Sequence, residues 1–83
     1  MKPKELAVDL PKTDLGTQNR PFDGRVAEQY AEKLKEWDGD WRFPPIVVFL
    51  DPETKVYAVA DGIHRLFAAK LAKRAKVPCD IRE

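Results

Sequence analysis

The chain has 83 residues, of which 43% are hydrophobic and 35% are charged, and its formal net charge is +1. This near-neutral balance excludes a global positive field that would draw the chain to nucleic acid or anionic lipid, so any DNA contact must be local. The composition is that of a globular protein, and the length allows one small hydrophobic core. We therefore expect a single domain over residues 1–83.

Cysteine and membrane signals are sparse. Cys79 is the one cysteine, which excludes an internal disulfide and gives a zinc site no second thiolate. The longest apolar run, Phe43 to Leu50, contains two prolines and is far shorter than a bilayer crossing. We find no signal-peptide pattern. These observations favour a cytoplasmic protein without a membrane partner.

The N-terminal part predicts a short strand followed by a long loop. Leu6, Val8 and Leu10 alternate with other residues, as in a half-buried strand, and Pro11 is expected to end it. Lys12 to Gly24 contains many turn formers and no periodicity, which is typical of a loop. Loops of this length in compact domains are usually functional or disordered.

The next segment predicts a helix from Arg25. Its apolar positions are Val26, Tyr30, Leu34 and Trp37, flanked by Ala27 and Ala31. These positions share one side of a 3.6-residue helix, and core packing accounts for both aromatic residues. Asp23 or Gly24 can begin the helix and Gly39 can end it.

A continuous β-branched and aromatic run, Ile46 to Leu50, predicts the central strand of a sheet. Its lack of alternation predicts that both faces of this strand are covered. Asp51 to Thr54 supplies a turn, and Lys55 to Ala60 is expected to return as the hairpin partner. The aromatic residues just before the strand, Trp41 and Phe43, have two readings: a partner surface or burial under the first helix.

The C-terminal part predicts a helix from His64 to Lys73 and a final strand. Ile63, Phe67 and Leu71 share the face expected to pack on the sheet, so Phe67 is read as a core residue. Val77, Cys79 and Ile81 alternate with more polar or turn-forming residues, which predicts a strand with Cys79 pointing inward. The predicted class is α+β, in the order β-α-β-β-α-β with a small mixed sheet and two helices.

The junction Asp61-Gly62-Ile63-His64-Arg65 is the strongest functional signal. A glycine between a strand and a helix permits a positive φ, so the next backbone amides can point at an anion. Arg65 adds a planar donor fork suited to phosphate, and His64 can change protonation near neutral pH. Structural readings stand beside this one, with Asp61 as helix N-cap and the two basic residues solvated. Gly62, His64 and Arg65 occur together at a strand-to-helix junction, where α/β proteins tend to bind ligands, and this combination favours an anion site.

These residues resemble the ParB/sulfiredoxin superfamily, in particular the ParB N-terminal domain and small stand-alone proteins similar to it. The resemblance spans nearly the whole chain. Its pieces are Gln18-Asn19-Arg20, Val26-Ala27-Glu28-Gln29-Tyr30-Ala31, Phe43-Pro44-Pro45-Ile46-Val47-Val48-Phe49, Ala60 to Lys70 with the junction above, and Val77-Pro78.

The resemblance implies a nucleotide-phosphate pocket. Its residues would be Gln18, Arg20, Gly62, Ile63, His64 and Arg65, with Arg20 closing over the phosphates. The ligand would be a nucleoside triphosphate, CTP or ATP, with Mg²⁺. In phosphoryl transfer, Asp61 would hold the metal and His64 would move the proton. ParB carries two adjacent basic residues where this chain has His64-Arg65. Sulfiredoxin places its catalytic cysteine where this chain has Ile63, so that repair chemistry is excluded here.

Three functional hypotheses stay open at this point. The first is a nucleotide-binding module that serves DNA maintenance, partition or a mobile element, with DNA or a DNA-bound protein as partner and a homodimer as one assembly. The second is an enzyme, either a ParB-like nuclease or a small-molecule phosphotransferase or NTPase. The third is a protein-interaction module that binds no nucleotide. The 83 residues include no helix-turn-helix of the kind that follows this domain in partition proteins, so we expect the chain alone not to read a centromere sequence.

Overall fold

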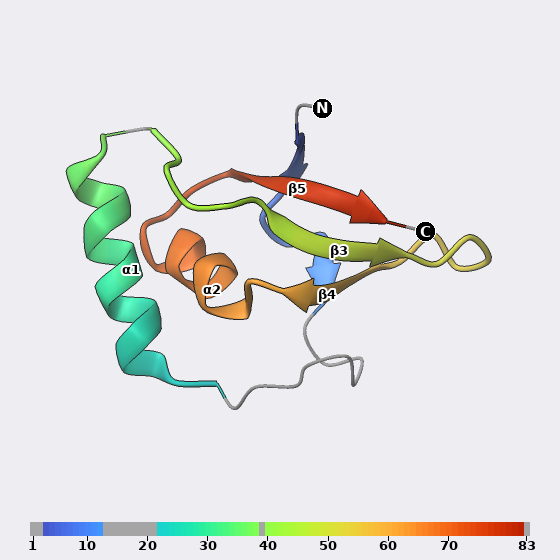
Figure 1. Ribbon diagram of the computed structural model, residues 1–83, viewed down its shortest axis with the longest axis horizontal. Helices are drawn as coiled ribbons and strands as arrows, with labels where there is room; N and C mark the ends of the chain where they lie inside the picture. The colour runs from blue at the N-terminus through green and yellow to red at the C-terminus, as the bar shows by residue number, and fades with distance from the viewer. Residues whose placement is uncertain (1–2, 13–21, 39, 83) are drawn as a thin grey trace.

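The computed structural model describes residues 3–12, 22–38 and 40–82. These residues form five strands and two helices: β1 Lys4–Ala7, β2 Pro11–Lys12, α1 Gly24–Glu36, β3 Ile46–Leu50, β4 Tyr57–Asp61, α2 Ile63–Leu71 and β5 Lys76–Arg82. The strands make one mixed sheet in the order β1-β5-β3-β4-β2 (Figure 1). The predicted α+β class is confirmed, with β3 in the centre and the N-terminal strand divided in two.

The sheet is strongly curled, because its two edge strands are consecutive in the chain. In a flat sheet, four interstrand steps of about 4.8 Å would separate β1 from β2 by about 19 Å. The chain from Ala7 to Pro11 spans at most about 14 Å even when fully extended. It also turns, since the Leu10 N–H donates to the Ala7 carbonyl at 3.0 Å. The two edges must therefore approach each other, which closes the sheet around its core.

Pro11 begins a strand instead of ending one, so the predicted end of the first strand is wrong. Pro11 pairs with Tyr57 in the parallel β2–β4 ladder. β2 is an edge strand, where a residue without a backbone N–H is tolerated. The side chain of Pro11 is buried, which gives it a packing role at the closing edge.

One face of the sheet forms the core. Its most deeply buried members are Ile46, Val48, Val59, Val77 and Cys79, and Leu66 of α2 packs with them. The other face is partly open, because Phe49 is 45% exposed. The prediction that Ile46–Leu50 is covered on both faces is therefore wrong. α2 contacts β3 and β5, while α1 packs against α2 (Figure 1).

The helices lie where the periodicity predicts them. α1 begins after Asp23, whose carboxylate accepts a hydrogen bond from the Arg25 N–H at 3.0 Å, while the proposed stop at Gly39 lies outside the described residues. In α2 the buried face is Leu66, Ala68 and Ala69. Phe67 is only half-buried and Leu71 is 51% exposed, so the prediction that Ile63, Phe67 and Leu71 form the face packed on the sheet, with Phe67 in the core, is wrong. Neither helix in the described ranges has the length and apolar character to cross a membrane.

The two aromatic residues before β3 are half-buried. Phe43 contacts Tyr30 and Trp37 of the α1 segment, at ring-centroid distances of 4.9 and 4.7 Å. Trp41 packs edge-on against Phe43 at 5.5 Å. Phe43 therefore packs beside the first helix without being fully buried, and these ring contacts hold the segment that enters β3.

Cys79 gives a testable pH dependence. Burial raises the pKa of its thiol from 9.0 to about 11, and the Glu5 carboxylate adds to the rise. The folded state therefore favours the neutral thiol, and this contribution to stability is complete below pH 9 and is lost as the pH rises through about 11. We expect the free energy of unfolding, measured in urea, to fall more steeply over this interval in the wild type than in Cys79→Ala. Parallel pH profiles would contradict the assignment.

Candidate functional site

β4 passes into α2 through a single residue, Gly62. Asp61 is the last residue of β4 and Ile63 is the first of α2. Gly62 has φ of 102° and ψ of 25°, in the left-handed region. A Cβ at this position would lie 2.8 Å from Nη2 of Arg65. The backbone conformation therefore favours glycine here, and an added Cβ would also force the end of the Arg65 side chain to shift.

The start of α2 has no side-chain cap. The alternative reading of Asp61 as the helix N-cap is wrong, because Gly62 occupies the N-cap position and no side chain hydrogen-bonds there. The first turn closes with the Leu66 N–H donating to the Gly62 carbonyl at 2.9 Å. The preceding amides, those of Ile63, His64 and Arg65, have no acceptor within the helix. They form the positive end of the helix dipole, which favours an anion.

Arg65 folds back across the turn. Its side chain is only 13% exposed. Its Nη1 donates to the Pro44 carbonyl at 3.2 Å, and its Nη2 lies 3.5 Å from the Asp61 carboxylate. The guanidinium is thus held beside the Gly62 turn by the end of β4 and by the segment that enters β3. Two of its nitrogens have these partners, and a guanidinium carries five N–H donors in all.

His64 ties the two helices together. Its Nε2 accepts a hydrogen bond from the backbone N–H of Asp23 at 3.0 Å. Its ring stacks on Phe22, with 5.4 Å between centroids and 11° between planes. An acceptor role for Nε2 requires a lone pair there, so the proton of the neutral ring is on Nδ1. In this arrangement Nδ1–H is the ring donor that remains for a ligand.

Asp61 lies at the mouth of the turn, with its side chain 63% exposed and Arg65 as its ion-pair partner. Among the described residues, no group of three or more His, Cys, Asp or Glu side chains could hold a metal ion. Mg²⁺ is often held by one or two carboxylates together with phosphate oxygens, so a single aspartate fits a metal that arrives with a nucleotide. Gln18 and Arg20, the other predicted ligands, lie outside the described residues.

The sequence missed two contributors to this site, Phe22 and Asp23. Phe22 is 49% exposed and packs on both His64 and Phe67. Asp23 was recognised only as a candidate start of α1, and its backbone contact with His64 joins residues 41 positions apart. The stack and the N-cap together place the beginning of α1 next to the Gly62 turn.

Replacing Gly62 tests the backbone requirement. We expect Gly62→Ala to lower the free energy of unfolding by about 1–2 kcal/mol, the usual cost of a left-handed conformation for a residue with a Cβ. Gly24→Ala is the matched control, because Gly24 lies in the first turn of α1 with only Phe22 at 4.0 Å from an added Cβ. Urea denaturation of both variants makes the measurement. Equal effects at the two positions would contradict a special role for Gly62.

The tautomer of His64 is also testable. We expect ¹⁵N spectra of the neutral imidazole to show the proton on Nδ1 and a lone pair on Nε2. His64→Ala should then move the Asp23 amide resonance, because that variant lacks the acceptor. The Arg25 amide, which donates to the Asp23 carboxylate, serves as an internal reference. A proton found on Nε2 would contradict the hydrogen bond.

Comparison with known proteins gives the fold. No protein-family model and no curated protein matches the sequence. The chain is similar to the ParB protein of Caulobacter crescentus in complex with CTP-γ-S, with a TM-score of 0.76 and 26% identity over 96% of this chain and 43% of that one. Sulfiredoxin from Arabidopsis thaliana gives 0.73 and 20%, over 96% and 83%. A free serine kinase in complex with AMP gives 0.77 and 17%, over 99% and 31%.

These similarities confirm the predicted ParB/sulfiredoxin fold. The chain spans less than half of the ParB chain and about a third of the kinase chain. Two of the similar proteins, ParB and the kinase, were solved with nucleotides bound. Nucleotide binding is therefore compatible with this fold.

Proposed function

We propose that the chain binds a nucleotide through its phosphates at the Gly62 turn and acts as a nucleotide-binding module. The observation that carries the proposal is the uncapped start of α2 behind a left-handed glycine, with the Arg65 guanidinium packed beside it. The nucleotides bound to the similar ParB and kinase structures support this choice of ligand.

Each group at the turn has a defined task in this proposal. The amides of Ile63, His64 and Arg65 receive phosphate oxygens, as at other helix N-termini. The Nδ1–H of His64 adds a side-chain donor. The Arg65 guanidinium supplies the charge, either with its remaining N–H groups or after leaving Pro44. Gln18 and Arg20 complete the pocket in our proposal.

The Asp61 carboxylate adds a second negative charge beside a phosphate bound at the Gly62 turn. This carboxylate would repel the phosphate, and its ion pair with Arg65 offsets part of that repulsion. With a nucleoside triphosphate, CTP or ATP, we propose that Asp61 holds Mg²⁺ that arrives with the phosphates. The metal would supply positive charge against the phosphate oxygens.

The geometry favours binding over catalysis. A general base needs a free lone pair, and the lone pair of His64 is used by the Asp23 N–H. The described residues also lack the clustered carboxylates of a two-metal nuclease. We propose a cytoplasmic module that serves DNA maintenance, with DNA or a DNA-bound protein as its partner. A homodimer is one assembly in which it would act.

Titration with ATP, CTP, GTP and ADP, with and without Mg²⁺, tests the proposal. We expect saturable binding with shifts of the amide resonances from Gly62 to Arg65. Arg65→Ala should weaken binding about tenfold or more, because a charge-assisted hydrogen bond contributes about 1.5–3 kcal/mol. Arg65→Lys should lose part of the affinity, since an ammonium keeps the charge without the planar fork.

The control variant is Arg82→Ala, because Arg82 pairs with Asp80 at the end of β5. It should bind nucleotide like the wild type. Melting temperatures of all variants separate lost binding from lost folding. Absence of binding to every nucleotide in the presence of Mg²⁺ would contradict the proposal. Metal-dependent turnover that His64→Ala abolishes would favour the enzyme hypothesis instead.

A further inference from the structure

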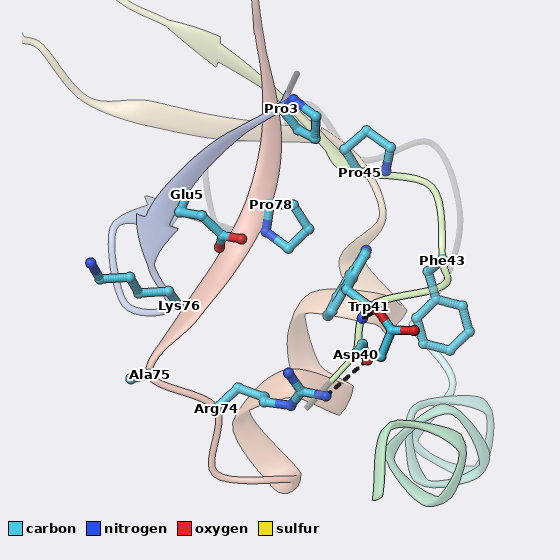
Figure 2. A pocket seen from close by; sticks show the side chains of 10 residues that line it. All are labelled: Pro3, Glu5, Asp40, Trp41, Phe43, Pro45, Arg74, Ala75, Lys76 and Pro78. Atoms are coloured by element: carbon cyan, nitrogen blue, oxygen red, sulfur yellow. Dashed lines mark hydrogen bonds between the residues drawn. The ribbon is translucent and has the colours of Figure 1, made fainter. Parts of the chain in front are cut away.

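A cavity of about 690 Å³ lies between the beginning of β1, the segment before β3 and the beginning of β5 (Figure 2). The charges of its ionisable lining residues cancel, two negative against two positive: Glu5, Asp40, Arg74 and Lys76. This cavity therefore has no net charge that would select an ionic ligand. A surface of more specific chemistry lies beside the Gly62 turn, where an aromatic ring is exposed.

That exposed ring is Phe22, which lies just before α1 and is 49% exposed. It stacks on the ring of His64, with 5.4 Å between centroids and 11° between planes. His64 is the second residue of α2, and its backbone amide is one of the three at the Gly62 turn that have no acceptor within the helix. Phe22 is therefore separated from the proposed phosphate site by a single side chain.

The described ring contacts of Phe22 all come from α2. Besides His64, the Phe22 ring contacts Phe67 at a centroid distance of 4.7 Å. His64 and Phe67 are three residues apart on the helix, so they share one of its sides. The exposed half of Phe22 therefore faces away from α2. Because the stack on His64 is nearly parallel, this outer surface presents a flat aromatic face to solvent.

The position of the ring is held by the backbone next to it. The N–H of Asp23 donates to Nε2 of His64 at 3.0 Å, and the Asp23 carboxylate accepts from the Arg25 N–H at 3.0 Å. Phe22 is bonded directly to Asp23, so these hydrogen bonds hold it beside the His64 ring. A ring that is already in place loses little conformational freedom when a ligand stacks on it.

The spacing of the two surfaces matches the chemistry of a nucleotide, which carries its phosphates and its base at opposite ends of one sugar. His64 lies between the surfaces. In our proposed function its amide and its Nδ1–H face the phosphates, and its ring supports Phe22. A nucleotide that reaches both surfaces would therefore pass over the His64 side chain.

We propose that the outer face of Phe22 is the stacking platform for the base of the nucleotide whose phosphates occupy the Gly62 turn. This inference rests on the proposed function and adds the recognition of the base to it. Every base has a π-face, so stacking accepts all of them and favours the larger ring of a purine. The ligand class is a nucleotide with any base, bound more tightly than a sugar phosphate without one.

A comparison of ATP with ribose 5-triphosphate, both with Mg²⁺, tests the platform. Ribose 5-triphosphate keeps the sugar and the phosphates of ATP and lacks the base. We expect ATP to bind about tenfold more tightly, which corresponds to about 1.4 kcal/mol and lies within the range for stacking of a base on an aromatic side chain. The base protons of bound ATP should shift upfield, as protons over an aromatic ring do.

Replacements of Phe22 assign the effect to its ring. Phe22→Leu keeps an apolar side chain without a π-face, and it should bind ATP and ribose 5-triphosphate with similar affinity. Phe22→Tyr keeps the ring and should retain the preference for ATP. Phe49→Ala is the matched control, because Phe49 is a phenyl ring of β3 with a similar exposure, 45%, and it should bind both ligands like the wild type.

The outcomes separate this inference from the proposed function. Equal binding of ATP and ribose 5-triphosphate to the wild type, or an unchanged preference in Phe22→Leu, would overturn the platform and leave the phosphate site standing. A Phe22→Leu variant that loses affinity for both ligands equally would also overturn it, because Phe22 would then only support His64. If neither ligand binds the wild type, both the platform and the proposed function are wrong.

Discussion

The left-handed conformation of Gly62 sets the direction in which α2 leaves β4. Because β4 turns into α2 within this one residue, the first turn of the helix faces the start of α1 and the segment before β3. That placement lets His64 reach Asp23 and lets Arg65 reach Pro44. A different angle at Gly62 would break both contacts and would redirect the free amides of α2. The candidate site and the packing of the two helices thus share one backbone constraint.

Local pattern was enough to predict most elements and the turn between β4 and α2. The 3.6-residue period predicted α1, and the β-branched run predicted β3. The glycine between a strand and a helix predicted the turn. The errors concern facts that neighbouring residues do not encode. A continuous apolar run cannot say which face of β3 is covered, so the exposure of Phe49 was missed. The contact of His64 with Asp23 spans 41 positions and that of Arg65 with Pro44 spans 21, and no local signal points to either.

A fold does not by itself fix the chemistry of a site, which depends on the side chains present there. In this chain the residue after the glycine is Ile63, an alkyl side chain, and the one cysteine is buried on β5 with a raised pKa. Neither offers a nucleophile at neutral pH. What remains at the turn is a set of hydrogen-bond donors and one carboxylate, which are the groups that our proposal assigns to holding a phosphate.

The backbone carbonyl of Pro44 accepts hydrogen bonds from two side chains in different parts of the fold. It accepts from the Arg65 guanidinium at the Gly62 turn and from the indole of Trp41 in the segment before β3. A carbonyl oxygen has two lone pairs, so both donors can be satisfied at once. One backbone oxygen therefore anchors both the guanidinium and the indole, so a change in the path of the segment before β3 would displace the two side chains together.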